Sequence, residues 1–140
     1  MTFTEVEQGY LTGRALGRLA SVGPDGAPQI HPVAFWIDNA TGAIDIGGPG
    51  LSRSQKFRNI KTDPRVAFVV DDLATPQETV GTDGQLGRGL EIRGRADILL
   101  RMAPLMDGFS EERLRLRPHR IVAWNLGAPG TNARDVVPDA

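Results

Sequence analysis

Short runs of β-forming residues separated by glycine- and proline-rich turns are the feature that most constrains this chain. Residues 16–22 and 29–37 are both strand-like, and Gly23-Pro24-Asp25-Gly26 between them is a strong turn sequence. Together they predict a β-hairpin. Pro32 cannot donate a hydrogen bond to a sheet, so we expect a sheet edge or a bulge near it. The 17 glycines and 10 prolines lie between such runs, as in a turn-rich β protein.

The same reasoning assigns the rest of the chain. Further strands are predicted over residues 43–46, 66–70, 90–98 and 119–126. Helices are predicted over residues 4–13, 51–61 and 109–114, with Ser52 as the N-cap candidate of the second. The continuous apolar run 66–70 indicates a strand buried on both faces. Residues 71–89 are expected to form a long loop, and the tail after residue 126 is expected to be mobile or to lie on a partner subunit.

Six short strands favour closure into a barrel, because closure removes the exposed edges and gives one core. A chain of 140 residues has the usual size of one domain, so we expect a single domain over residues 1–140. The fold class is therefore mainly β, a barrel with short flanking helices. A barrel of this size is marginal alone, and dimerisation would stabilise it.

Composition excludes several classes of function. The 16 basic and 17 acidic residues give a net charge of -1 and form no one-sign run, which disfavours nucleic-acid binding. The chain has no cysteine and only two histidines, so no metal site is expected. The first residues lack the pattern of a signal peptide, and no apolar run is long enough to span a membrane, so a cytoplasmic protein without membrane contact is expected.

The segment most indicative of chemistry joins a glycine-rich loop to a predicted helix. Gly47-Gly48-Pro49-Gly50 allows close approach of a ligand to the backbone, and Arg53 and Lys56 follow three positions apart on one predicted helical face. This combination predicts a phosphate site. It is neither a Walker loop nor a dinucleotide fingerprint, because the lysine spacing and the surrounding elements differ. The alternative is an ordinary turn followed by a solvated helix face.

These segments resemble the pyridoxamine 5'-phosphate oxidase-like superfamily. The resemblance runs from the hairpin of residues 19–35 through Ser52-Arg53-Ser54-Gln55-Lys56-Phe57-Arg58-Asn59-Ile60 to Asp63-Pro64-Arg65-Val66. The closing segments, residues 91–96 and 117–125, are similar to its actinobacterial F420-dependent branch, the flavin/deazaflavin oxidoreductase B group. The resemblance covers most of the chain.

The resemblance implies an FMN-binding split β-barrel that forms a homodimer, with cofactor sites at the subunit interface. It also implies that the bound cofactor is the deazaflavin coenzyme F420, with FMN as the alternative. The residues that match the family's cofactor site are His31, Pro32, Val33, Ser52, Arg53, Gln55, Lys56, Asn59 and Trp124. Arg134 is expected near the same site, from the end of the barrel or from the other subunit.

Three functions remain open from the sequence. The first is an F420-dependent reductase that transfers a hydride to an unsaturated small molecule, and the second is an FMN enzyme of the same fold. The third is a non-enzymatic binder of haem or of the cofactor, since His31 and His119 are available. No catalytic residue is identified, and no counterpart of the substrate-phosphate arginines of the pyridoxal phosphate-forming oxidase is found, so neither its activity nor any other substrate is assigned.

Overall fold

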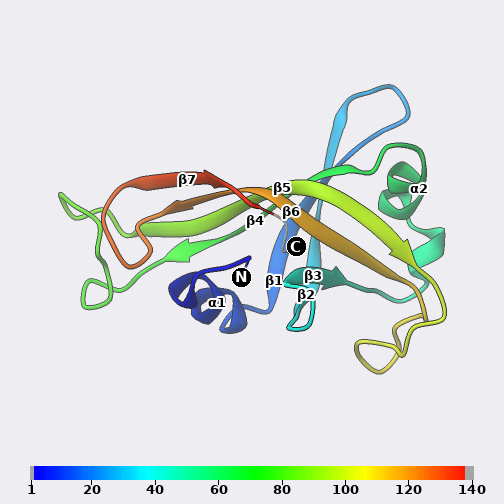
Figure 1. The fold of residues 1–140 in the computed structure, drawn as a ribbon, viewed down its shortest axis with the longest axis horizontal. Coiled ribbons are helices and arrows are strands. Elements are labelled where there is room, and N and C mark those ends of the chain that lie inside the picture. The colour runs from blue at the N-terminus through cyan, green and yellow to red at the C-terminus, as the bar shows by residue number, and fades with distance from the viewer. Residues whose placement is uncertain (1, 138–140) are drawn as a thin grey trace.

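The computed structural model describes residues 2–137, which form seven strands, two α-helices and one 3-10 turn. Their bounds are α1 Glu5–Thr12, β1 Leu16–Val22, β2 Pro28–Asp38, β3 Ala43–Ile46, η1 Leu51–Arg53, α2 Gln55–Thr62, β4 Arg65–Leu73, β5 Gly87–Leu99, β6 Arg113–Trp124 and β7 Thr131–Asp135. Strands therefore dominate the fold (Figure 1).

The sheet closes on itself. Its strand order is β3-β2-β1-β4-β5-β6-β7, and an additional β3–β6 pairing closes the first six strands into a barrel. Every pairing is antiparallel, and β7 extends the sheet beyond β6. In Figure 1, α2 lies at one end of the long strands beside the β1–β2 hairpin, and α1 lies against the barrel. The prediction of a split β-barrel with short flanking helices is confirmed.

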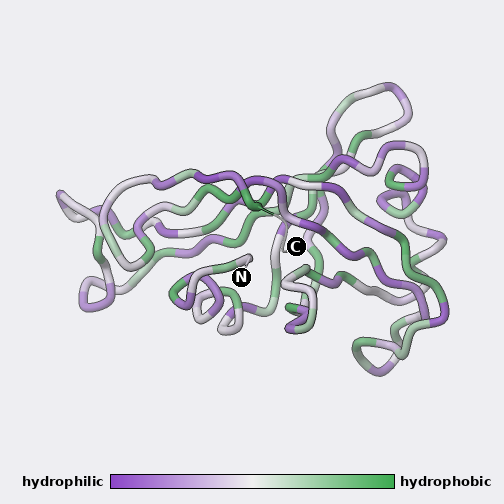
Figure 2. Tube along the Cα trace, in the orientation of Figure 1, coloured by the Kyte–Doolittle hydropathy of each residue, from purple (hydrophilic) through white to green (hydrophobic). Residues whose placement is uncertain are grey.

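The core follows the two-residue period of the strands. Gly17, Leu19 and Ser21 face inward on β1, as their alternation predicts. Gly17 has no room for a side chain, because a Cβ there would overlap the Phe68 ring. Figure 2 shows the resulting interleaving of polar and apolar residues along the long strands.

Two predictions around β4 are wrong. Its apolar run alternates, with Phe68 buried but Ala67 and Val69 only half-buried, so the strand is not buried on both faces. The predicted loop 71–89 is shorter, because Asp71 to Leu73 continue β4 and pair with the start of β5. Polar residues at a strand end can still complete a ladder when a partner strand is in register.

The C-terminal part differs further from the prediction. Residues 109–112 form no helix, and β6 begins at Arg113. The tail contributes a seventh strand, β7, which pairs with β6 instead of being mobile. The part of the expected tail after residue 137 lies outside the described residues.

Both α-helices have the expected ends, with one correction. Thr4 and Glu7 form a capping box at α1. At α2 the N-cap is Ser54 rather than Ser52, because residues 51–53 form a separate 3-10 turn. Neither helix, nor any other helical segment among residues 2–137, has the length and apolarity to cross a membrane.

Candidate functional site

Lys56 is the centre of a small cavity between α2 and the β1–β2 hairpin. The side chain is half-buried in a cavity of about 160 Å³ whose other lining residues are Leu19, Ser21, Gln29, Ile30, His31, Ser54 and Gln55. No carboxylate of residues 2–137 lies within ion-pair distance of it. Burial therefore lowers the pKa of Lys56 without an opposing charge. This cavity, which we call the Lys56 cavity, therefore contains a cation with no carboxylate of a described residue within ion-pair distance.

Asn59 holds this cavity together. Its side chain is 3% exposed, and its Nδ2 donates to Ser21 Oγ at 3.0 Å and to Gln29 Oε1 at 2.9 Å. Its Oδ1 accepts from Gln55 Nε2 at 2.7 Å. These bonds use the amide group of Asn59 within the protein, so Asn59 fixes α2 against both hairpin strands rather than presenting a free donor.

Ser52 and Arg53 lie outside the Lys56 cavity, on the preceding turn. Ser54 is extended, which separates η1 from α2, so the expectation that Arg53 and Lys56 share one helical face is wrong. Both Ser52 and Arg53 are exposed, and the Arg53 guanidinium lies against Gly50, whose φ is +58°. Arg53 has no ion pair with a described residue and remains within the same segment of chain as Lys56.

The turn is capped by residues that the sequence analysis assigned to a helix. Ser110 Oγ accepts from Leu51 N at 3.0 Å and donates to Gly48 O at 3.1 Å. Glu112 Oε1 accepts from Ser52 N at 3.1 Å, and hydrogen bonding from Ser52 lowers the pKa of this carboxyl. The backbone amides of Leu51 and Ser52 are therefore already hydrogen-bonded within the protein. No local sequence signal predicts this cap, because its partners are 59 and 60 residues apart in the chain.

The predicted β2 residues follow the strand away from the Lys56 cavity. His31 lines the cavity and is exposed, Pro32 is exposed, and Val33 is buried. Residues 28–34 pair with β1 only, since β3 begins to pair at Phe35, so Pro32 lies on a free sheet edge as predicted.

Trp124 and Arg134 are not brought to this site within the chain. Trp124 ends β6, pairs with Gly89 of β5 and Thr131 of β7, and lines no part of the Lys56 cavity. Arg134 binds both carboxylate oxygens of Glu7 at 2.7 Å and the carbonyl of Thr2 at 2.9 Å, which secures β7 to α1.

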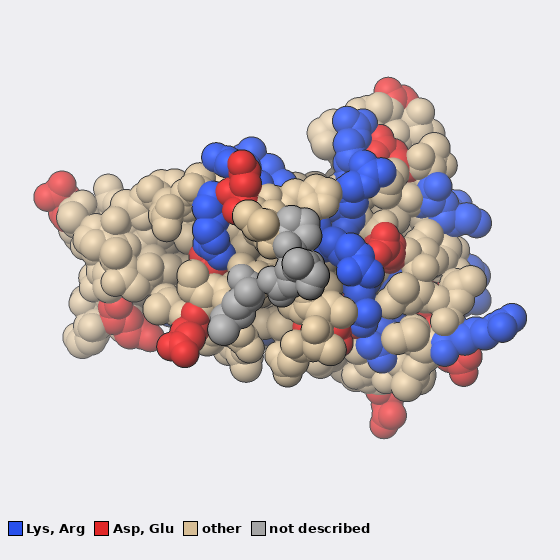
Figure 3. All heavy atoms as spheres, in the orientation of Figure 1, with Lys and Arg blue, Asp and Glu red and all other residues tan. Residues whose placement is uncertain are grey.

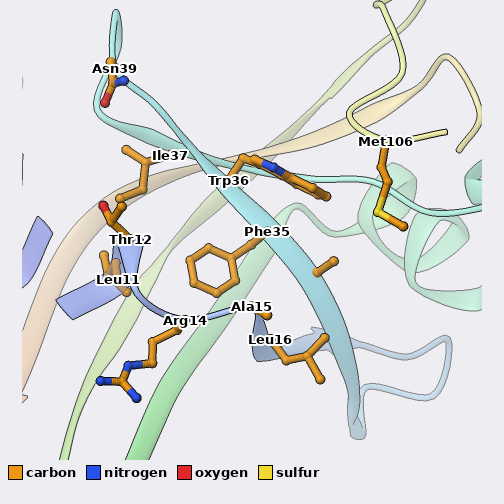
Figure 4. A pocket seen from close by; sticks show the side chains of 11 residues that line it. Leu11, Thr12, Arg14, Ala15, Leu16, Phe35, Trp36, Ile37, Asn39 and Met106 are labelled. Carbon is orange, nitrogen blue, oxygen red and sulfur yellow. The ribbon is translucent and has the colours of Figure 1, made fainter. Parts of the chain in front are cut away.

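A second and larger cavity lies further along β2. It measures about 490 Å³ and is lined by Leu11, Thr12, Arg14, Ala15, Leu16, Ala34, Phe35, Trp36, Ile37, Asn39 and Met106 (Figure 4). We call it the Trp36 cavity. Its lining is mostly apolar, and its one charged member, Arg14, donates to Asp72 Oδ2 at 2.9 Å. The two cavities therefore differ in both size and charge.

Comparison with known proteins gives a consistent result. The sequence profile described as pyridoxamine 5'-phosphate oxidase matches residues 3–133. A curated protein of Streptomyces rimosus named 5a,11a-dehydrotetracycline/5a,11a-dehydrooxytetracycline reductase is 39% identical over 97% of this chain and 94% of its own length.

Solved structures share the fold. A conserved hypothetical protein from Mycobacterium tuberculosis superimposes with a TM-score of 0.66 at 22% identity, over 88% of this chain and 85% of that one. A structure named F420 reductase has a TM-score of 0.54 at 26% identity, over 76% of this chain and 88% of that one. A heme binding protein from Mycobacterium smegmatis has a TM-score of 0.66 at 14% identity, and the match covers 96% of this chain and 59% of that one.

Proposed function

The chain belongs to the pyridoxamine 5'-phosphate oxidase family, and from this premise we propose that it is an F420-dependent reductase. Family and fold imply an oxidoreductase with a flavin-type cofactor. The finer assignment to F420 is supported by the similarity to a structure named F420 reductase. The assignment as a reductase is supported by the relative from Streptomyces rimosus, which is named as a reductase of 5a,11a-dehydrotetracycline and 5a,11a-dehydrooxytetracycline.

Lys56 carries the proposal. A half-buried ammonium without a carboxylate is costly unless an anion completes it, and a phosphate provides charge and several acceptor oxygens. The residues of the Lys56 cavity thus fit a phosphorylated cofactor. Lys56 would hold the phosphate and Arg53 would reach it from η1, while Asn59 keeps the cavity walls in register.

The other predicted residues have distinct roles. Ser52 lies on the capped turn beside Arg53, and Gln55 lines the cavity while its amide holds Asn59. His31, Pro32 and Val33 form the strand along which the ring system of the cofactor would lie. The reduced cofactor, when bound, supplies the hydride for an electron-poor double bond. The chain positions that ring and the acceptor and excludes water, which requires no nucleophile.

FMN is the second candidate, because it carries the same phosphate and the Lys56 cavity does not distinguish the two. A haem-binding role has less support. The similarity to the heme binding protein is one of fold alone, and His31 and His119 are both exposed.

We propose that the active form is a homodimer. The outer face of the β1–β2 hairpin exposes an apolar patch at Ile30, which is 67% exposed and lies outside the Trp36 cavity. Covering such a patch with a second copy removes it from water. Trp124 lines no part of the Lys56 cavity within one chain, so in a dimer it would approach the cofactor from the other subunit. Light scattering should report about twice the chain mass of 15.1 kDa, and a mass of one chain at micromolar concentration would contradict the dimer.

The deciding experiment is a fluorescence titration of the purified protein with oxidised F420 and, separately, with FMN. Selective binding of F420, followed by oxidation of reduced F420 in the presence of an unsaturated acceptor, is the expected result. Selective binding of FMN would favour the second candidate, and binding of neither would overturn the proposal.

A further inference from the structure

The Trp36 cavity has the properties of a small-molecule site. Its volume of about 490 Å³ falls within the range of roughly 300–1,000 Å³ that holds drug-sized ligands. Three segments build it: residues 11–16 from the end of α1 to the start of β1, residues 34–39 of β2 and the turn after it, and Met106 from the loop between β5 and β6. Figure 4 shows Trp36 and Met106 on the opposite side of Phe35 from Leu11 and Thr12.

Aromatic and flexible apolar groups form its walls. The Trp36 ring is held edge-on against Phe109, with ring centroids 6.0 Å apart, and Phe35 packs edge-on against Phe68 at 5.2 Å. Met106 is 54% exposed at the cavity. Fixed aromatic walls favour flat ring systems, and an unbranched methionine adapts to their outline.

No free charge faces this cavity among the described residues. The guanidinium of Arg14 is engaged by Asp72 and stacks on the Tyr10 ring at 4.6 Å, and Asp72 is also bound by Arg88. In Figure 4 the guanidinium points away from Trp36 and Met106. The remaining polar groups, Thr12 and Asn39, are uncharged and suit a carbonyl or hydroxyl oxygen. An ionised ligand would lose hydration here without a counter-ion.

The position of the cavity connects it to the proposed chemistry. The β2 residues 29–31 line the Lys56 cavity, residues 34–37 line the Trp36 cavity, and Pro32 and Val33 lie between them. One strand thus joins an anion-binding end to an apolar end.

We infer that the Trp36 cavity is the acceptor subsite and takes a neutral, planar molecule of several fused rings. This inference rests on the proposed reductase function for its catalytic meaning. Binding of such a molecule to the cavity is nevertheless measurable without any cofactor.

The test uses Trp36 as its own reporter. In a Trp124→Phe background Trp36 is the sole tryptophan, and its fluorescence is followed on addition of 2-(hydroxymethyl)anthraquinone or of anthraquinone-2-carboxylate. The two probes share the ring system and differ in charge. The neutral probe should bind at least about tenfold more tightly than the carboxylate.

Ala15 lines the cavity, so a larger side chain at this position would occupy part of its volume. Ala15→Phe should weaken the neutral probe by about tenfold or more, whereas Ala15→Ser, which leaves the space open, should change it by less than about twofold. Equal binding of the two probes, or no effect of Ala15→Phe, would overturn the inference. Conversion of a dimer to a monomer by Ala15→Phe would also overturn it, because the cavity would then be covered by a second copy. A failed F420 titration with the expected probe binding would instead overturn only the cofactor assignment.

Discussion

Half-buried cations of the barrel are paired with a carboxylate, whereas the cations of the η1–α2 segment have no such partner among residues 2–137. On the barrel, Asp45 is 2% exposed and binds both Arg113 and Arg115, with nitrogen–oxygen distances of 2.7–3.0 Å. The segment from residue 53 to residue 61 instead carries Arg53, Lys56, Arg58 and Lys61, and none of these forms an ion pair with a carboxylate of residues 2–137.

Several exposed arginines elsewhere also pair with carboxylates. Figure 3 shows a band of Lys and Arg side chains crossing the long strands on one face. Arg95 lies opposite both Arg65 and Arg117 in the sheet, an unfavourable arrangement of like charges. Arg65 is paired with Asp63, and Arg117 with Asp97. Local carboxylates thus pair with two of these three arginines, whereas the cations of the η1–α2 segment have no carboxylate partner among residues 2–137.

The largest effect on stability is expected when a buried carboxylate that binds two arginines is removed from the barrel. Asp45→Asn leaves the guanidiniums of Arg113 and Arg115, 16% and 13% exposed, without their shared carboxylate. The free energy of unfolding should fall by about 3–5 kcal/mol. Urea denaturation measures it, with Asp97→Asn as control: its pair with Arg117 is about half exposed and should contribute no more than about 1 kcal/mol. Equal losses in both variants would contradict the distinction between buried and exposed pairs.

The second effect should appear in binding and not in stability. Lys56→Ala should weaken F420 binding by ~1 to 3 kcal/mol, through loss of a charge-assisted contact to the phosphate. The fold should remain intact, because burial of the unpaired ammonium already disfavours its charged form. Lys61→Ala is the matched control, since Lys61 is exposed on the same helix and lines no part of the Lys56 cavity. Unchanged affinity in Lys56→Ala would remove the phosphate assignment.

The sequence predicts structure that depends on nearby residues better than structure that depends on distant ones. The hairpin and α1 depend on partners a few residues apart, such as Thr4 with Glu7, and both were predicted. Ser110 and Glu112 are residue types that favour a helix start, but they bond to Leu51 and Ser52, 59 and 60 residues away. Sequence periodicity carries no information about such partners.

The seventh strand and the break before α2 were missed for different reasons. Asn125 adopts a positive φ of 51° and its side chain accepts from Gly130 N at 2.9 Å, so residues 125–130 contain a turn signal that could have predicted β7. The extended backbone of Ser54 had no comparable signal, and it separates Arg53 from the helix that carries Lys56. The grouping of His31, Gln55 and Lys56 came from the family resemblance, and the cavity contains all three.

A smaller effect is expected at the turn that presents Arg53. Gly50 has a φ of +58°, so Gly50→Ala should lower the free energy of unfolding by about 1–2 kcal/mol. A Cβ there would also displace the Arg53 guanidinium, which should weaken F420 binding less than Lys56→Ala does. Gly48→Ala is the control, because its Cβ would meet only Leu51 at an ordinary 3.9 Å. Similar affinity in the two glycine variants would show that binding does not depend on the placement of Arg53.

The smallest effect is expected in the pH dependence of stability, through the paired carboxylate of Asp72. Hydrogen bonding from Arg88 lowers the pKa of Asp72 from its usual 3.8 to about 2. Because the carboxyl binds its proton less readily in the folded state, its contribution to stability is present above pH 4 and is lost as the pH falls toward 2. Asp72→Asn should therefore lower the urea midpoint at pH 7 and reduce its dependence on pH between 4 and 2. Lys56→Ala should leave that acid dependence unchanged, because an ammonium does not titrate there. An unaltered acid dependence in Asp72→Asn would mean that the arginines around Asp72 do not depend on its charge, which would remove the difference between partnered and unpartnered cations at this position.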